Sequence, residues 1–368
     1  MSQTSHKTGG ILPAHVISRM IAQGELKLAR PADSDQIQPA SLDLRLGPVA
    51  YRVRASFLPG PDRTVAERLE TPSLHRINIE EGAVLETNCV YIVPLLESLA
   101  LPKGVAATAN PKSSTGRLDI FTRVITDHAR TFDEIPDGYH GPLYAEISPL
   151  SFSVLVRAGS RLSQIRFRQG PLVASDDLIR HLQSTEGLVT SGTVNIDRGL
   201  ALTVDLQGVA GQPVGFRAKK HSGLIDVDRK DALEVLDFWE PIWQRGSLVL
   251  DPDQFYILVS KEAVRVPPAY AAEMTPFNPL VGEFRVHYAG FFDPGFGHSS
   301  GGGEGSRGVL EVRSHDVPFI LEDGQIIGRL IYEPLTEKPE QVYGQGIGSN
   351  YQKQGLKLSK HFKVFQGQ

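Results

Sequence analysis

Cysteine is almost absent from this sequence, and long apolar runs do not occur in it. Cys89 is the only cysteine among the 368 residues, so the chain cannot form an intrachain disulfide. No run of about 18 apolar residues is present, which argues against a membrane-spanning helix. The opening residues, MSQTSHKTGG, contain no apolar core of the kind found in secretory signals. We therefore expect a soluble protein in a reducing cytoplasm.

The sequence also has little excess of either charge. Lys and Arg together number 38 and Asp and Glu number 42, which gives a formal net charge of -4. Proteins that bind nucleic acid along a broad face cluster Lys and Arg so as to contact many phosphates. We expect no nucleic-acid partner and no membrane partner. Recognition of phosphate should be local and directed at a small molecule.

Glycine and proline, in contrast, are abundant, with 36 and 25 residues. They separate short runs rich in Val, Ile, Leu, Phe and Tyr, a pattern typical of many short strands in a sandwich or barrel. Helical spacing is limited to ILPAHVISRMIAQGEL near the start, a polar stretch at 178–187, and a short one at 231–239. The sequence predicts a mostly β fold with a few short helices. Its length favours two domains, which we place at 1–185 and 186–368.

The two halves repeat each other. YIVPLLESLALP from Tyr91 parallels YILVSKEAVRVP from Tyr256 at an offset of about 165 residues. The same offset aligns AEISPLSFSVLVRAGSRLSQIRF with LEVRSHDVPFILEDGQIIGRLIY, which pairs Glu146 with Glu311. A weaker match joins SLDLRLG at Ser41 to TVDLQG at Thr203 with a spacing a few residues different. We interpret the chain as a tandem duplication with altered loops.

The segment KSSTGR has the composition of a phosphate-binding turn. Lys112 and Arg117 supply two cations, and Ser113 and Ser114 supply two hydroxyl donors around the flexible Gly116. The spacing is not that of a P-loop, and the same residues are also ordinary for a solvated loop. At the corresponding place the second half reads TPFNPL over 275–280, which has no cation. We expect that half to bind a triphosphate poorly.

Two glutamates lie in apolar runs that resemble strands. Glu146 in LYAEISPL and Glu311 in GVLEVRSH are each open to two interpretations. Strand alternation can simply turn such a side chain outward. Partial burial would instead raise its pKa and suit it to proton transfer.

Two further segments carry candidate binding residues. Asp293 lies in the turn signal FFDPGFG, whose counterpart in the first half reads IPDGYHG. The Gly-rich tail offers Tyr343, Tyr351, Lys353 and Gln354, which could fold over a ligand, although tails of this composition are commonly disordered.

Taken in order, these segments resemble the deoxycytidine triphosphate (dCTP) deaminase family, in its tandem-duplicated long form, whose relatives are the trimeric deoxyuridine triphosphatases (dUTPases). In the first half the resemblance rests on the opening helix, QPASLDLRLG, KSSTGRLDIF and the Glu146 strand. In the second half it rests on VDLQG, FFDPGFG, GVLEV and the tail. It implies two tandem dUTPase-like domains, each a distorted β-barrel or jelly roll.

The resemblance also implies an activity, the hydrolytic deamination of dCTP to dUTP and ammonia in pyrimidine deoxynucleotide biosynthesis. The zinc signature of cytidine deaminases, H-x-E with P-C-x-x-C, is missing, and one cysteine cannot build that site. Zinc is therefore not expected to activate the water. Magnesium is expected to enter with the triphosphate rather than on a protein cage, and no metal-binding residues are expected. The alternatives are a dUTP diphosphatase or bifunctional enzyme, and a nucleotide-binding protein without catalysis.

By the same resemblance, individual residues receive roles. Ser113 and Arg117 would position the water and phosphates, Ser114 would donate to phosphate, and the acid/base would be Glu146 or Glu311. The other expected nucleotide-binding residues are Lys112, where the family usually has arginine, Thr126, where alanine is common, Asp293, and the closing tail residues Tyr343 and Gln354.

Sites of this family lie between subunits, so a homo-oligomer is expected, either a trimer or an assembly of pseudo-trimers. We favour association of first halves with one another, which would complete a site from Ser113, Arg117 and Glu146. The main alternative is a mixed site that joins 112–117 to Glu311.

Overall fold

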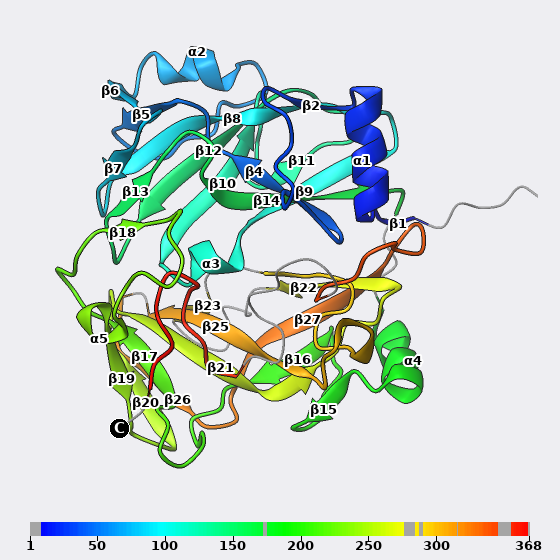
Figure 1. The fold of residues 1–368 in the computed structure, drawn as a ribbon, viewed down its shortest axis with the longest axis vertical. Helices are drawn as coiled ribbons and strands as arrows, with labels where there is room; N and C mark the ends of the chain where they lie inside the picture. The colour runs from blue at the N-terminus through cyan, green and yellow to red at the C-terminus, as the bar shows by residue number, and fades with distance from the viewer. Residues whose placement is uncertain are drawn as a thin grey trace, which may run out of the picture.

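The computed structural model describes residues 9–171, 175–275, 284–286, 290–314, 316–344 and 355–366. It consists of two β-rich halves, the first blue to green and the second green to red in Figure 1, with the short helix α3 at their junction. Within the described residues, no helix is both long and apolar enough to cross a bilayer.

Antiparallel sheets make up the first half. One runs in the order β11-β9-β14-β4-β3, with β1 also on β14. Its strands are β11 (Glu134–Ile135), β9 (Val105–Pro111), β14 (Arg161–Gln169), β4 (Ser41–Arg45), β3 (Ile37–Gln38) and β1 (Gly10–Ile11). Another runs β10-β12-β8-β5-β6, with β2 on β8. Its strands are β10 (Ile120–Thr126), β12 (His140–Pro149), β8 (Val90–Ala100), β5 (Val49–Val53), β6 (Ser73–Asn78) and β2 (Leu26–Leu28).

The second half repeats this plan. One sheet runs β19-β17-β21-β25-β23, with β15 on β21. Its strands are β19 (Trp239–Ile242), β17 (Gly215–Ala218), β21 (Phe255–Val264), β25 (Ser306–Ser314), β23 (Phe284–Val286) and β15 (Val189–Ser191). Another runs β16-β27-β22-β24. Its strands are β16 (Leu200–Thr203), β27 (Ile326–Pro334), β22 (Tyr270–Thr275) and β24 (Phe291–Phe292). A further pair is β20 (Ser247–Leu250) with β26 (Phe319–Glu322).

One small sheet crosses between the halves. In the order β18-β13-β7, it places β18 of the second half parallel to β13 of the first. Its strands are β18 (Ile225–Asp226), β13 (Val154–Val156) and β7 (Ala83–Leu85).

Helices are few and short, as the sequence predicts. Those in the described residues are α1 (Ala14–Gln23), α2 (Val65–Leu69), α3 (Ser113–Gly116), α4 (Asp176–Glu186), α5 (Val235–Phe238) and the 3₁₀ turn η2 (Ser299–Gly301). The expected helix over 231–239 is shortened to α5. Helix α1 ends at Gly24, which takes the left-handed conformation (φ 75°) that glycine adopts most easily. Helix α4 packs on the apolar core of the second half through Ile179 and Leu182. The domain division at 185 falls inside α4 and stays a prediction.

The duplication is visible in the strand register. Glu146 lies opposite Ile92 between β12 and β8, and Glu311 lies opposite Ile257 between β25 and β21. Both glutamates therefore occupy the same place in their half, at the offset of 165 residues that the sequence predicts.

The weaker sequence match is wrong by four residues. Gly47 donates its N–H to Pro94 O, and Asp205 donates its N–H to Val259 O. Pro94 and Val259 are equivalent at the 165-residue offset, so Gly47 corresponds to Asp205. The match of SLDLRLG to TVDLQG had aligned Asp43 with Asp205. A shift by an even number keeps the same face of a strand buried, so alternation alone does not reveal the error.

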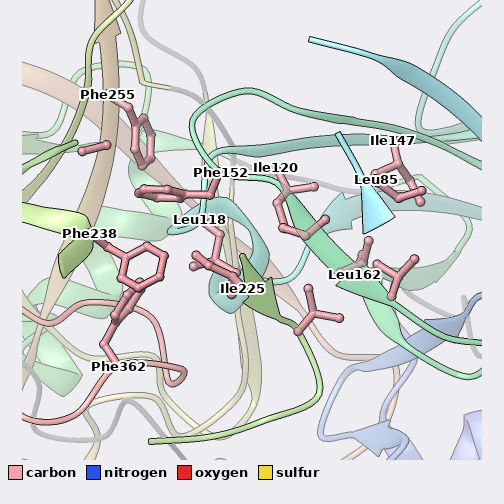
Figure 2. Close-up of a cluster of buried hydrophobic side chains, with 14 of the residues drawn as sticks. Leu85, Leu118, Ile120, Ile147, Phe152, Leu162, Ile225, Phe238, Phe255 and Phe362 are labelled. Carbon is pink, nitrogen blue, oxygen red and sulfur yellow. The ribbon is translucent and has the colours of Figure 1, made fainter. Parts of the chain in front are cut away.

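The largest apolar core joins the two halves. Figure 2 shows labelled side chains of the first half converging with those of the second. They are Leu85, Leu118, Ile120, Ile147, Phe152 and Leu162 from the first half, and Ile225, Phe238, Phe255 and Phe362 from the second. Leu118 and Ile120 follow α3 directly in the chain, so the same packing holds α3 against the second half.

Candidate functional site

The KSSTGR segment folds into the single turn α3 at the junction of the halves (Figure 1). Lys112 is extended, donates its N–H to Leu162 O, and its carbonyl accepts from the N–H groups of Thr115 and Gly116. Ser113 is exposed, whereas Ser114 and Arg117 are buried. The turn thus exposes the side chain of Ser113 to solvent, whereas the side chains of Ser114 and Arg117 are packed in the interior.

Buried polar groups hold the ends of this turn. The Lys112 ammonium donates to the carboxylate of Asp43, which lies on β4 and is almost fully buried. Arg117 Nη1 donates to Lys357 O at 2.9 Å, and Ser359 Oγ donates to Ser114 O at 2.7 Å. The C-terminal segment 355–366 therefore lies across α3.

Glu311 is the carboxylate that meets α3. A β-carbon built on Gly116 would lie 2.6 Å from Glu311 Oε2, so the carboxylate occupies the space that the missing side chain leaves. The side chain is buried, and burial raises its pKa well above the usual value. The Arg117 guanidinium opposes that rise and the Asp119 carboxylate adds to it. A buried, weakly acidic carboxyl group beside an arginine is suited to proton transfer.

Glu146 is held elsewhere. Arg123 lies opposite it on β10 and donates from Nη2 to its Oε1 at 2.5 Å. The guanidinium also donates to Ser56 Oγ and lies over the Phe132 ring at 3.4 Å from the centroid. In this chain the buried carboxylate of Glu146 is thus paired with the partly exposed Arg123, and it is not brought to α3. The association of first halves that would give it a partner turn stays a prediction.

Asp293 joins the α3 region through Arg166 of β14. Arg166 Nη2 lies 3.3 Å from Asp293 Oδ1, and Nη1 donates to Ala272 O at 3.0 Å. Burial raises the pKa of Asp293, Arg166 lowers it, and the charges of Asp43 and Lys112 also act on it. The turn that contains Asp293 therefore lies within electrostatic reach of Lys112.

The remaining predicted residues divide into three groups. Tyr343 adjoins the Asp293 turn, because its N–H donates to Pro294 O at 2.7 Å and its ring packs 5.8 Å from that of Phe296. Thr126 ends β10, about 20 Å from the end that follows α3 at the usual rise of a strand. There it lines a cavity of about 960 Å³ in the first half. Gln354, with Tyr351 and Lys353, lies outside the described residues.

Several polar residues at this junction were not singled out in the sequence. Asp43 and Arg166 are charged residues in buried strands, which is the signal that could have found them. Lys360 gave no signal. Its ammonium is half-buried, and desolvation together with Lys112, Lys230 and Arg161 lowers its pKa to about 8, while Asp43 opposes that shift. The C-terminal segment thus adds a cation beside Lys112.

Within the described part of the chain, no three His, Cys, Asp or Glu side chains converge as a metal site would require.

A serine-rich cationic turn facing a buried carboxyl group, on a duplicated β fold, is an arrangement that can contact phosphate oxygens and transfer protons. The chain belongs to the 2'-deoxycytidine 5'-triphosphate deaminase family: the N-terminal domain of that family matches residues 8–171, and its C-terminal domain matches residues 175–362.

Relatives agree with this assignment. The crystal structure of 2'-deoxycytidine 5'-triphosphate deaminase from Agrobacterium tumefaciens is 61% identical, has a TM-score of 0.86, and matches over 89% of this chain and 99% of its own. The dCTP deaminase of Haloarcula marismortui is 32% identical over 161 residues, covering 42% of this chain and 77% of the relative. A dUMP-forming dCTP deaminase of a Sulfurihydrogenibium species is 29% identical over 160 residues, covering 43% and 82%. The family and the mostly β, dUTPase-like fold predicted from the sequence are confirmed.

Proposed function

We propose that the chain converts dCTP and water to dUTP and ammonia at a site between its own halves, built from the Lys112–Arg117 turn and Glu311. The observation that carries this proposal is the placement of the Glu311 carboxylate directly against Gly116. Of the two alternatives that the sequence leaves open, this is the mixed site.

In this mechanism Glu311 moves the protons. Ionised Glu311 takes a proton from water as the oxygen attacks C4 of cytosine, and then passes that proton to ring nitrogen N3. It takes a second proton from the new hydroxyl group and delivers it to the departing amine. A carboxyl group whose pKa is raised by burial can serve as both base and acid, a contribution typically worth about 10²–10⁴ in rate. Ser113 and Arg117 hold the water and the substrate in line.

The triphosphate lies along the cations of the junction in this proposal. Lys112, Ser113 and Ser114 contact its oxygens, and Asp293 and Tyr343 bound the nucleoside. Support comes from the cluster of positive charge that Lys112 shares with Lys360. Magnesium would arrive as part of the substrate, because it is usually bound through phosphate oxygens with one or two carboxylates.

Product analysis tests the assignment. Wild type, Glu311→Gln and Glu146→Gln are incubated with dCTP, and ammonia, dUTP, dUMP and pyrophosphate are measured. We expect the Glu146 variant to deaminate at a rate near that of wild type and the Glu311 variant to lose at least about 10² in kcat. Retained activity in Glu311→Gln would overturn the mixed site, and pyrophosphate with dUMP would assign the activity named for the Sulfurihydrogenibium relative.

We also propose that the chain forms a homo-oligomer in the cytoplasm. The single Cys89 is compatible with a reducing compartment, and the resemblance to a family with sites between subunits supports association. Sedimentation velocity of the purified chain distinguishes a monomer from a trimer.

A further inference from the structure

An ion pair between the halves lies beside the proposed reactive groups and was not used by the mechanism. Asp119 follows α3, two residues after Arg117, and Arg313 follows Glu311 by two residues on β25. Arg313 Nη2 donates to Asp119 Oδ2, which also accepts from Ser151 Oγ at 2.6 Å. Asp119 is fully buried, and Arg313 is nearly so.

The strand pattern explains why both contacts form together. Leu310 and Val312 of β25 pack into the core of the second half. Because side chains alternate along a strand, Glu311 and Arg313 face the opposite way, toward the first half. Glu311 meets Gly116 and Arg313 meets Asp119, so the strand and the turn touch at two neighbouring points.

Local backbone structure fixes Asp119 in this place. The residue takes the left-handed conformation (φ 56°), its N–H donates to Gly116 O at 2.9 Å, and its O accepts from Leu150 N at 3.0 Å. A non-glycine residue in this region is uncommon and is kept only where its surroundings hold it.

We propose that Asp119 and Arg313 are positioning residues, whose ion pair sets the distance between Arg117 and Glu311 and holds the charge of Asp119 beside Glu311. This inference rests on the proposed function, since it concerns the same site. The charged groups that act on Glu311 from the first half are Arg117 and Asp119. Arg313 is its charged neighbour on the same face of its own strand.

The pH profile separates this role from a purely structural one. With Asp119→Asn the negative charge that disfavours ionised Glu311 is lost, so the acidic limb of kcat/KM for dCTP moves to lower pH. With Arg313→Gln the positive charge that offsets Asp119 is lost, so the limb moves to higher pH. We expect kcat to fall about tenfold or more in both, with KM within about twofold of wild type. Loosened packing alone would not shift the acidic limb of kcat/KM in opposite directions in the two variants.

A matched control exists in the same molecule. Arg157 and Asp226 also form an ion pair between the halves, with Nη1 to Oδ1 at 2.8 Å and Nη2 to Oδ2 at 2.9 Å. Asp226→Asn is expected to lower stability while leaving kcat and the pH profile as in wild type. A profile and kcat for Asp119→Asn that match those of Asp226→Asn would overturn the proposal.

A measurement that does not need activity separates failure of this inference from failure of the proposed function. Glu311→Gln is made alone and with Asp119→Asn, and the free energy of unfolding is compared at pH 8. If the charges are coupled, the change caused by Glu311→Gln is smaller in the Asp119→Asn background. If the effects of Glu311→Gln and Asp119→Asn on the free energy of unfolding are additive, the inference is overturned. If they are coupled but the wild-type chain does not deaminate dCTP, only the proposed function is overturned. If Asp119→Asn does not fold, Arg313→Gln replaces it as the second background. The change in unfolding free energy caused by Glu311→Gln should then be larger than in wild type.

Discussion

Replacing Glu311 with glutamine is expected to make the chain more stable and less active. Burial raises the pKa of Glu311 well above the usual value, so the folded chain binds this proton more tightly than the unfolded chain does. The free energy of unfolding therefore falls as pH rises from the ordinary glutamate range through the folded pKa, and it stays lowered above that pKa.

The size of the effect follows from this linkage. Each unit of pKa elevation lowers the free energy of unfolding by about 1.4 kcal/mol at high pH. Glutamine removes that loss, but it also removes the attraction between the Glu311 carboxylate and the Arg117 guanidinium. We expect a net gain of about 0.5–2 kcal/mol at pH 8, a rise in Tm of a few degrees, and a smaller gain at pH 5.

Urea unfolding at pH 5 and pH 8, together with ammonia release from dCTP, measures both effects. The variant should lose activity by at least about 10² in kcat. A variant less stable than wild type at pH 8, or a gain equal at the two pH values, would refute the assignment of a costly buried charge to Glu311.

Three further perturbations test residues within the proposed site and away from it. Lys360→Gln should raise KM for dCTP severalfold because a cation beside Lys112 is lost. The control Lys363→Gln should leave KM unchanged, because Lys363 is paired with Glu234. Steady-state kinetics at two salt concentrations compares the two variants. Glu146→Gln should lower the free energy of unfolding by about 1–3 kcal/mol, because the buried carboxylate loses its charge and its ion pair with Arg123, while kcat stays unchanged. Urea titration and the ammonia assay check both effects. His361 has its pKa lowered to about 4 by burial, so the chain should lose stability as pH falls from about 6.5 toward 4; Tm measured across that range should depend less on pH in His361→Asn, and an equal slope would contradict the account.

The strands and the first helix could be predicted because their signals are local. Helix α1 shows its apolar spacing and its glycine stop in the sequence itself. The offset of the repeat could be found because hydroxyl aromatics and glycines mark fixed turns. In each copy the tyrosine hydroxyl accepts from the backbone five residues earlier, Tyr91 from Glu86 and Tyr256 from Asp251. Both contacts join residues only five apart in the chain, which neighbouring residues are enough to specify.

The choice between two equivalent glutamates could not be made in this way. Glu146 and Glu311 occupy the same strand position in their halves, so their own surroundings in sequence look alike. What separates them is packing between distant segments, since Arg123 neutralises one and α3 meets the other. The pairing of Arg123 with Glu146 across β10 and β12 is the one signal that could have been sought, because opposite charges at facing strand positions attract.

In the proposed mixed site, the phosphate-binding turn comes from one half and the acid/base from the other, which would account for the divergence of the two copies. A turn such as 112–117 and a glutamate such as Glu311 need to meet only once in each chain for the proposed reaction. Once the halves are linked so that α3 faces β25, the glutamate of the first half no longer has to remain available, and it is free to pair with Arg123. The same reasoning applies to TPFNPL, where loss of the cations leaves the second half without a phosphate turn. Introducing a lysine there should therefore not create a second site, because the carboxylate of Glu146 is already paired with Arg123.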